Sequence, residues 1–334
     1  MERLEIRDYS VNRAAAAMIK DAMRRADELS IRVSRSVCGA TLVDMGLECP
    51  GGWEAGRIFV EAGLGGLGRA TFGTFPLVTR HSSPVTLPSI NVWVDDPVIA
   101  TVASQAGDWK LGDGEFAAIG SGPARAIAHQ DRWSTRADYT DRADEVVVQL
   151  QTTSAPDDGL CLRVAEACGV RPENVYVVFA PTGCIVGSIQ VASRTVEQVM
   201  VKLLVHGFDT RSDTVRFGFG IAPVAPVSHD EGEAMGRAND CLIYGGATML
   251  YVDTDDESIE AVIGNLCFDV HAGELWGLPF ARIFERFGRN WFQVPHLVDS
   301  PARVTINNVR TGRTFSGGQI NVEVLRQSLL VGRD

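Results

Sequence analysis

The sequence predicts a two-domain protein of α+β or α/β architecture. Of its 334 residues, 45% are hydrophobic, and a chain of this length and composition exceeds one ordinary core. Short strand-like runs alternate with helix-like runs along the whole chain. The polar stretch at residues 128–142 has no sustained apolar period, which is typical of a surface connection. We therefore expect domains at residues 1–142 and 143–334, with the C-terminal elements able to pack back on the first domain.

Local patterns predict the elements of the first half. The run after Ser10 is rich in Ala, Met, Arg and Leu, which favour a helix, and Ser10 or Asn12 can cap it. Pro50-Gly51-Gly52 breaks the chain before the next helix. The expected elements are a helix at 11–29, hairpin strands at 31–37 and 41–45, a helix from Trp53, and strands at 89–94 and 145–150.

The second half shows the same alternation. Here Ser193 can cap a helix that follows a strand-like apolar run. The expected elements are a helix at 158–168, strands at 174–179 and 185–191, a helix at 193–206, a strand at 241–252 and a closing helix at 321–329.

Charge and hydropathy limit the possible partners. The chain has 42 acidic and 31 basic residues, and its net charge of −11 would repel the phosphates of nucleic acid. Its first residues carry charges and lack the apolar core of a signal peptide. Since no stretch approaches the ~18 apolar residues of a membrane span, we expect a cytoplasmic protein that binds neither nucleic acid nor a membrane.

Cysteine and histidine spacing gives no sign of a metal or redox site. The seven cysteines form no C-x-x-C pair, and the six histidines form no H-x-x-x-H pair, so reduced and mostly buried thiols are expected. The acidic run at residues 229–233 has two interpretations, a metal-binding tract or the first turn of a helix. Favourable interaction of acids with the helix dipole supports the second.

Two glycine-rich strings resemble phosphate-binding loops. The G-x-G-x-x-G string at residues 63–68 follows a helical pattern instead of the strand that a dinucleotide site requires, so a helix ending explains it better. The string at residues 120–125 follows a strand-like run over 116–119 and precedes helix-forming residues. Its turn and Arg125 could bind an anion, although an ordinary turn remains an equal alternative. It lacks the Lys and Ser/Thr pair of nucleotide hydrolases.

Arg194 and Glu197 stand three residues apart on one face of the predicted 193–206 helix. Such a pair is usually a surface ion pair. From the residues alone, Arg194 and Glu197 could be either a surface ion pair or a catalytic pair.

Short strings with a characteristic order are spread over almost the whole chain. They include Gly52-Trp53-Glu54-Ala55-Gly56, Ala118-Ile119-Gly120-Ser121-Gly122-Pro123-Ala124-Arg125-Ala126, Pro172-Glu173-Asn174-Val175-Tyr176, Ala180-Pro181-Thr182, Ile185-Val186-Gly187-Ser188-Ile189-Gln190, Arg194 with Glu197, Ala222-Pro223-Val224-Ala225-Pro226 and Asn239-Asp240. In these strings and their order the chain resembles the methenyltetrahydromethanopterin cyclohydrolase family. Departures are at the N-terminal extension and residues 154–159 and 265–271.

The resemblance implies an α+β fold of two α/β-type domains with a deep cleft between them. It also implies a homo-oligomer, favoured as a trimer, and catalysis without a metal or redox cofactor. The substrate would be methenyl-tetrahydromethanopterin of one-carbon metabolism, opened by water to the 5-formyl compound. Glu197 would deprotonate the water and Arg194 would hold Glu197. The implied substrate-binding residues are Ser121, Gly122, Arg125, Pro181, Thr182, Ser188, Gln190, Asn239 and Asp240, with the 120–125 turn as first candidate for the anionic tail and Asn239 and Asp240 for the pterin edge.

The sequence leaves three alternatives to the function that the resemblance implies. The chain could be a folate cyclohydrolase, or another enzyme of the pathway that transfers a formyl group or a hydride. It could also be a non-catalytic pterin-binding protein or structural oligomer, in which Arg194 and Glu197 form a mere ion pair.

Overall fold

The computed structural model describes residues 9–79, 84–111, 118–289, 293–294 and 298–330. The chain divides into two compact units, each assembled from two separate segments. Unit 1 comprises Met1–Gly68 and Val98–Pro181, and unit 2 comprises Arg69–Pro97 and Thr182–Asp334. Both units contain a six-stranded mixed sheet and several helices, so the α+β class with two domains is confirmed.

Unit 1 has a sheet with the strand order β1-β2-β8-β7-β6-β5. Strands β2, β8 and β7 run parallel, and the outer pairs are antiparallel. Its elements are α1 (Val11–Arg24), α2 (Ala26–Leu29), β1 (Arg32–Arg35), β2 (Thr41–Asp44), α3 (Trp53–Gly63), the π-helix η2 (Val98–Gln105), β5 (Trp109–Leu111), β6 (Ala118–Ser121), α4 (Arg125–Ala128), the 3₁₀ helix η3 (Ser134–Arg136), β7 (Val146–Gln151), α5 (Asp158–Cys168), the 3₁₀ helix η4 (Pro172–Asn174) and β8 (Val175–Ala180).

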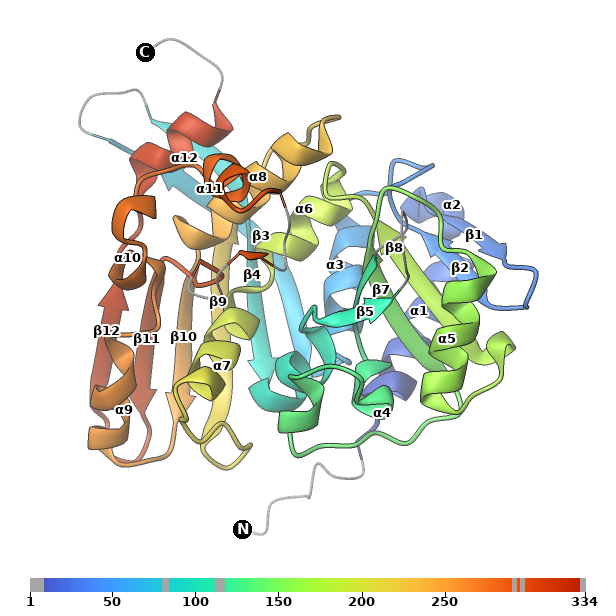
Figure 1. Ribbon diagram of the computed structural model, residues 1–334, viewed down its shortest axis with the longest axis horizontal. Coiled ribbons are helices and arrows are strands. Elements are labelled where there is room, and N and C mark those ends of the chain that lie inside the picture. The colour runs from blue at the N-terminus through green and yellow to red at the C-terminus, as the bar shows by residue number, and fades with distance from the viewer. Residues whose placement is uncertain (1–8, 80–83, 112–117, 290–292, 295–297, 331–334) are drawn as a thin grey trace. The chain divides into compact units, whose positions relative to one another are not determined.

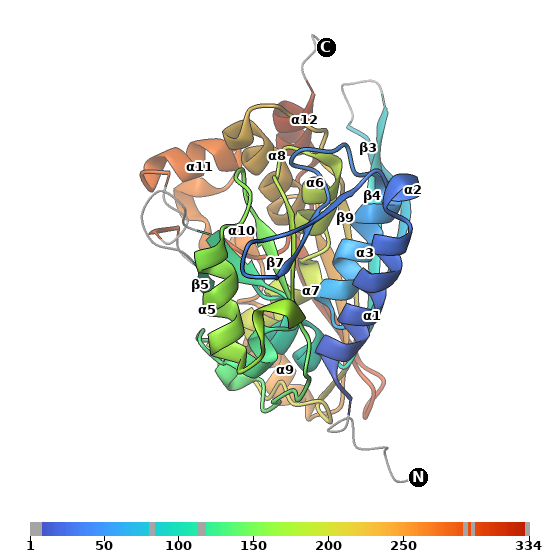
Figure 2. The ribbon, with the colours of Figure 1, turned by 90° about the vertical axis from the view of Figure 1, so that its right-hand side faces the viewer.

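Helices lie on both faces of the unit 1 sheet. Figure 2 shows α1 and α3 on one side of β7 and α5 on the other. Strand β8 and all of β7 except Gln151 are consequently buried on both faces, which explains the apolar run of β8 and the three valines that begin β7. Ser10 caps α1 through the N–H of Arg13, as the sequence predicts.

Unit 2 has a sheet with the order β12-β11-β10-β9-β4-β3, in which β10 and β11 are parallel. Its elements are β3 (Gly68–Leu77), β4 (Val85–Asp95), α6 (Ile185–Ala192), α7 (Thr195–Val205), β9 (Val215–Pro223), α8 (Glu231–Ile243), β10 (Ala247–Val252), α9 (Asp256–Ile263), α10 (Phe268–His271), the 3₁₀ helix η5 (Gly273–Leu275), α11 (Phe280–Arg286), β11 (Arg303–Asn308), β12 (Thr314–Gly318) and α12 (Val322–Leu329).

One face of the unit 2 sheet is covered by helices. Helix α7 packs on β9 and β10, α6 on β4 and β9, and α9 on β11 and β12. On the other face, Trp93 of β4 and Phe217 of β9 are half exposed, and the Trp93 ring contacts that of Phe219. The strands therefore alternate between a buried helical side and an open aromatic side.

Several predicted elements are confirmed. Helix α5 matches the predicted helix at 158–168, and α12 matches the closing helix within one residue. The 11–29 run forms two helices that divide at Arg25. The 63–68 glycine string ends helix α3 and leads into β3, so the strand-to-helix context of a dinucleotide loop is absent. Within that string Gly65 has a φ of +61°, where a Cβ would lie 2.4 Å from the Val11 Cβ.

Other expectations were wrong. Residues 185–191, predicted as a strand, form α6, because this apolar run is buried on most sides and shows no period that separates helix from strand. Of the predicted 241–252 strand, residues 241–243 end α8 and β10 begins at Ala247. Part of the 116–119 run lies outside the described residues, and its remainder begins β6.

The compact units do not follow the predicted division at residue 142. Strand β7 follows that point but pairs with β6 and β8 inside unit 1. The 128–142 segment also contains buried residues, including Asp131, Trp133 and Asp141. Its polar character therefore comes partly from buried side chains that bond inside unit 1 and partly from exposed ones, such as Arg132 and Arg136.

Candidate functional site

The predicted catalytic pair lies where α6 meets α7. Only Ser193 and Arg194 separate these helices, and Arg194 occupies the position before the first turn of α7. Its guanidinium donates to the Gln190 amide oxygen at 3.1 Å and to the Glu197 carboxylate at 3.0 Å. The two helices thus bring Gln190, Arg194 and Glu197 into one hydrogen-bonded row.

Glu197 is nearly buried and lies beside a positive charge. Its side chain is 9% exposed and that of Arg194 is 18% exposed. Glu197 lies in the first turn of α7, where the helix dipole stabilises a negative charge, and the Arg194 charge adds to that effect. A fixed, partly desolvated carboxylate of this kind can accept a proton from a water molecule.

Ser193 does not cap α7 as predicted. Its hydroxyl donates to the Gln190 carbonyl oxygen at the end of α6. The cap position belongs to Arg194, without a capping side chain.

Thr182 and Ser188 lie in unit 2 before and within α6, whereas Pro181 ends the second segment of unit 1. The Ser188 hydroxyl donates to the Ala225 carbonyl oxygen at 2.8 Å. The backbone N–H groups of Thr182 and the following residue both bind the Glu231 carboxylate, at 2.7 and 2.9 Å. Glu231 therefore fixes the turn that leads into α6.

Asn239 and Asp240 lie on the buried side of α8. The Asn239 amide donates to the Met235 carbonyl oxygen. The Asp240 carboxylate is fully buried and accepts hydrogen bonds from the Phe280 N–H and the Ser328 hydroxyl. Burial raises the pKa of Asp240 to about 7, and these two hydrogen bonds oppose the rise. Asp240 thus joins α8 to α11 and α12, and this geometry favours a structural role over direct contact with a pterin.

Replacing Asp240 should change how stability depends on pH. Its carboxyl titrates near 3.9 in an unfolded chain and at about 7 in the folded protein, so the folded state holds the extra proton between these values. The stability that Asp240 contributes is therefore present below pH ~4 and lost as pH rises through 7. We expect the free energy of unfolding of Asp240→Asn to match that of the parent near pH 4. At pH 8 it should exceed the parental value by up to about 4 kcal/mol.

Urea unfolding of both proteins from pH 4 to 8 measures this difference. A constant difference between the two proteins over that range would contradict the assignment of a raised pKa to Asp240.

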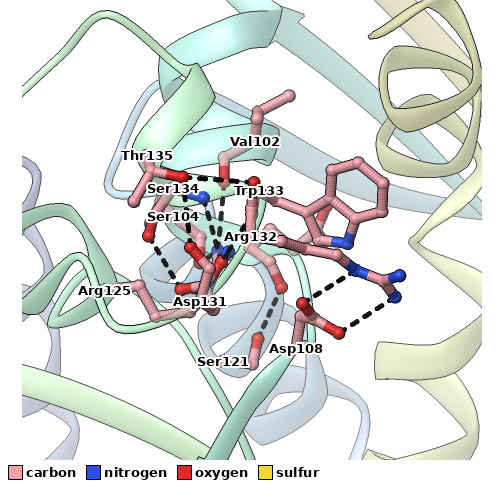
Figure 3. A network of polar contacts seen from close by, with 11 residues as sticks. Val102, Ser104, Asp108, Ser121, Arg125, Asp131, Arg132, Trp133, Ser134 and Thr135 are labelled. Atoms are coloured by element: carbon pink, nitrogen blue, oxygen red, sulfur yellow. Dashed lines mark hydrogen bonds and ion pairs between the residues drawn. The ribbon is translucent and has the colours of Figure 1, made fainter. Parts of the chain in front are cut away.

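In unit 1, Arg125 is at the centre of a buried polar network (Figure 3). Its guanidinium forms two hydrogen bonds with the Asp131 carboxylate and also donates to the carbonyl oxygens of Val102 and Ser104. Both charged side chains are completely buried. Burial raises the pKa of Asp131, but the Arg125 charge and hydrogen bonds outweigh it, so the pKa lies below its usual value.

The structure does not support the expected anion site at residues 120–125. Arg125 is occupied inside the unit, and the other donors of the turn bind carbonyl oxygens there. These bonds join the Gly122 N–H to Ser104, the Ala124 N–H to Val147 and the Ser121 hydroxyl to Gln105. These donors are therefore engaged within unit 1, and the φ of +93° at Gly122 explains the glycine.

Sequence reasoning missed two residues that organise these regions. The sequence predicts Glu231 as an acid in the first turn of a helix, and the structure confirms that position at the start of α8. The sequence pattern gives no sign that Glu231 also binds the N–H groups of the turn before α6. Asp131 was placed on a surface connection. The Asp-x-x-Ser spacing to Ser134, whose N–H and hydroxyl both donate to Asp131, was the signal that could have identified an ordered turn.

All seven cysteines are free thiols. Within the described part of the chain, no three His, Cys, Asp or Glu side chains are grouped to hold a metal ion. The described helices include none long and apolar enough to cross a membrane.

Fold and site together define a two-domain α+β protein with a guanidinium-bound carboxylate suited to acid–base chemistry. The family model described as "Cyclohydrolase (MCH)" matches residues 10–329. The chain is 37% identical to the methenyltetrahydromethanopterin cyclohydrolase of Methanococcus maripaludis strain C7 over 96% of its own length and 98% of the relative. Over the same shares it is 35% identical to that of Methanocaldococcus jannaschii and 36% to that of Methanothermobacter marburgensis. The chain belongs to the methenyltetrahydromethanopterin cyclohydrolase family.

Proposed function

We propose that the protein hydrolyses 5,10-methenyl-tetrahydromethanopterin to the 5-formyl compound, reversibly and in the cytoplasm. Family membership over almost the whole chain supports this activity. The row formed by Gln190, Arg194 and Glu197 is the observation that gives it a chemical basis.

The reaction requires a positioned water and a base. The methenyl bridge is a cationic amidinium, whose carbon is already electrophilic. Glu197 removes a proton from the water as its oxygen bonds to that carbon, and the bond from carbon to one ring nitrogen then breaks, with that nitrogen taking up a proton. The balance is one water consumed and one proton released. Arg194 holds Glu197 in place through their ion pair.

Residues near this pair are the first candidates for substrate contact. Thr182, Ser188 and Gln190 lie before or on α6, within the chain that leads to Arg194. We retain them, with Pro181 and Asn239, as substrate-binding residues. The anionic tail needs local donors because the protein is net acidic. Donors other than Arg125 are favoured, since Arg125 is buried and bonded to Asp131 and two carbonyl oxygens. No metal or redox cofactor has a step in this mechanism.

Isotope transfer from water tests the reaction itself. In H₂¹⁸O the 5-formyl product of a single turnover should carry one ¹⁸O atom, detected by mass spectrometry with a no-enzyme control. Product without the isotope would exclude attack by water and favour transfer from a second substrate.

We further propose a homotrimer in which the open face of the unit 2 sheet is the contact between subunits. The half-exposed Trp93 and Phe217 lie on this face, and exposed aromatic patches are typical of protein interfaces.

Trp93→Glu should therefore reduce the mass measured by light scattering from trimer to monomer. Leu162→Glu on α5, an equally exposed apolar residue of unit 1, is the matched control and should leave a trimer. A Trp93→Glu trimer would contradict the proposed surface.

A further inference from the structure

The inner face of α7 carries polar side chains where a buried helix normally carries apolar ones. Thr195, Gln198 and Lys202 are spaced three and four residues apart, so they share one face of the helix. All three are at most 2% exposed. Helix α7 packs on β9 and β10. Burying polar groups in such a place costs stability unless they form hydrogen bonds.

Among the described residues, four polar atoms at this interface have no hydrogen-bond partner in the protein. They are Thr195 Oγ1, Gln198 Oε1 and Lys202 Nζ on α7 and Thr248 Oγ1 on β10. We call this group the α7 seam. Buried groups of this kind are normally satisfied by ordered water when protein atoms do not reach them.

At one end of the α7 seam, a glycine without a side chain makes room for the Thr195 hydroxyl. Gly220 of β9 lies directly opposite Thr248 of β10, so the two residues point to the same face of the sheet. A Cβ placed on Gly220 would lie 2.0 Å from the Thr195 hydroxyl oxygen. The glycine therefore lets Thr195 approach the sheet near Thr248.

Charge is concentrated at the other end. Burial lowers the pKa of Lys202 to about 8, and the Asp299 charge opposes this effect. The Gln198 amide donates to the Asp299 carboxylate at 2.5 Å, whereas the Lys202 ammonium forms no direct bond with it. This end of the helix thus offers an ammonium, an amide oxygen and a carboxylate, and about three such partners are typical of a buried water.

We propose that the α7 seam binds ordered water, one molecule between Lys202, Gln198 and Asp299 and another between Thr195 and Thr248. These waters hold the part of α7 that carries Glu197, which makes Lys202 a positioning residue. The consequence for turnover rests on the proposed role of Glu197, whereas the water sites do not.

A crystal structure of the full chain at high resolution tests the water sites. We expect a density peak within hydrogen-bond distance of Lys202 Nζ and Gln198 Oε1, and another between the two threonine hydroxyls. A direct hydrogen bond from Lys202 to Asp299, or the absence of density peaks at the two water sites, would overturn the proposal.

The sign of a stability change provides a test in solution. Thr248→Val removes a hydroxyl that holds water, so the melting temperature should fall by about 2–4 °C. If no water binds the hydroxyl, its removal should raise the melting temperature, because a buried group without a hydrogen-bond partner is lost. Thr74→Val on β3 of the same sheet, where the threonine is exposed, is the control and should change little.

Kinetics of Lys202→Met separate positioning from a purely structural role. We expect kcat to fall about tenfold or more with KM nearly unchanged, because a small displacement of a catalytic group slows chemistry more than binding. An unchanged kcat would exclude the positioning role. If Glu197→Gln also retains full turnover while the density peaks are present, the proposed role of Glu197 as base fails and the water sites stand.

Discussion

Glu197→Gln should lower kcat by about 10²–10⁴-fold and leave substrate affinity nearly unchanged. The amide is isosteric and can still contact Arg194 through its oxygen, so the row from Gln190 through Arg194 remains. The amide cannot take the proton from water at neutral pH. Single-turnover rates and equilibrium binding of the methenyl compound separate the two effects.

Glu257→Gln is the matched control for this experiment. Glu257 is also a first-turn acid, on α9 of the same unit. It should keep the parental kcat. A Glu197→Gln enzyme as fast as the Glu257→Gln enzyme would remove Glu197 from the role of base.

Arg125→Met should destabilise the protein by about 3–5 kcal/mol, because it leaves the Asp131 carboxylate buried without its counter-charge. The two carbonyl oxygens that Arg125 now binds would also lose a donor. Urea unfolding followed by far-UV circular dichroism measures the loss. The residual turnover of the folded fraction should stay close to that of the parent if Arg125 does not bind substrate.

Arg24→Met provides the comparison for the buried pair. Arg24 forms an ion pair with Asp21 at 2.7 Å, but its side chain is 70% exposed, so removal should cost less than about 1 kcal/mol. Equal losses for the two variants would show that burial does not set the strength of the Arg125 pair. A large rise in KM with unchanged stability for Arg125→Met would restore the anion-site interpretation.

The sequence predicts elements well where the signals for them are local. Helix α5 begins after the capping Asp157 and ends at Gly169, which has a φ of +65°, so both ends are marked in the sequence. The run that forms α6 has no comparable marks. It is apolar and β-branched, and its helical state depends on packing against other parts of unit 2.

Long-range pairing explains why the division of the chain differs from the predicted one. Strand β8 pairs on one side with β7 and on the other with β2, which is more than 100 residues earlier. The β3 and β4 strands that interrupt unit 1 belong to the other sheet. No local pattern marks such an exchange of segments between units.

The candidate site shows the same limit. The spacing of Arg194 and Glu197 predicts an ion pair, which is confirmed, but it does not separate a catalytic pair from a surface pair. The resemblance assigned the roles, and the structure adds Gln190 as the third member of the row. For Arg125, the sequence shows a possible anion ligand, and the partner that excludes this is Asp131, six residues later.

Loss of the methenyl absorption band on mixing chelator-treated protein with methenyl-tetrahydromethanopterin tests the proposed function most directly, with methenyl-tetrahydrofolate in parallel. We predict rapid loss with the methanopterin compound, without a nicotinamide or any second substrate, and little loss with the folate. Loss with the folate alone would indicate a folate cyclohydrolase. No loss with either compound would contradict hydrolysis, and tight binding without turnover would then indicate a pterin-binding protein.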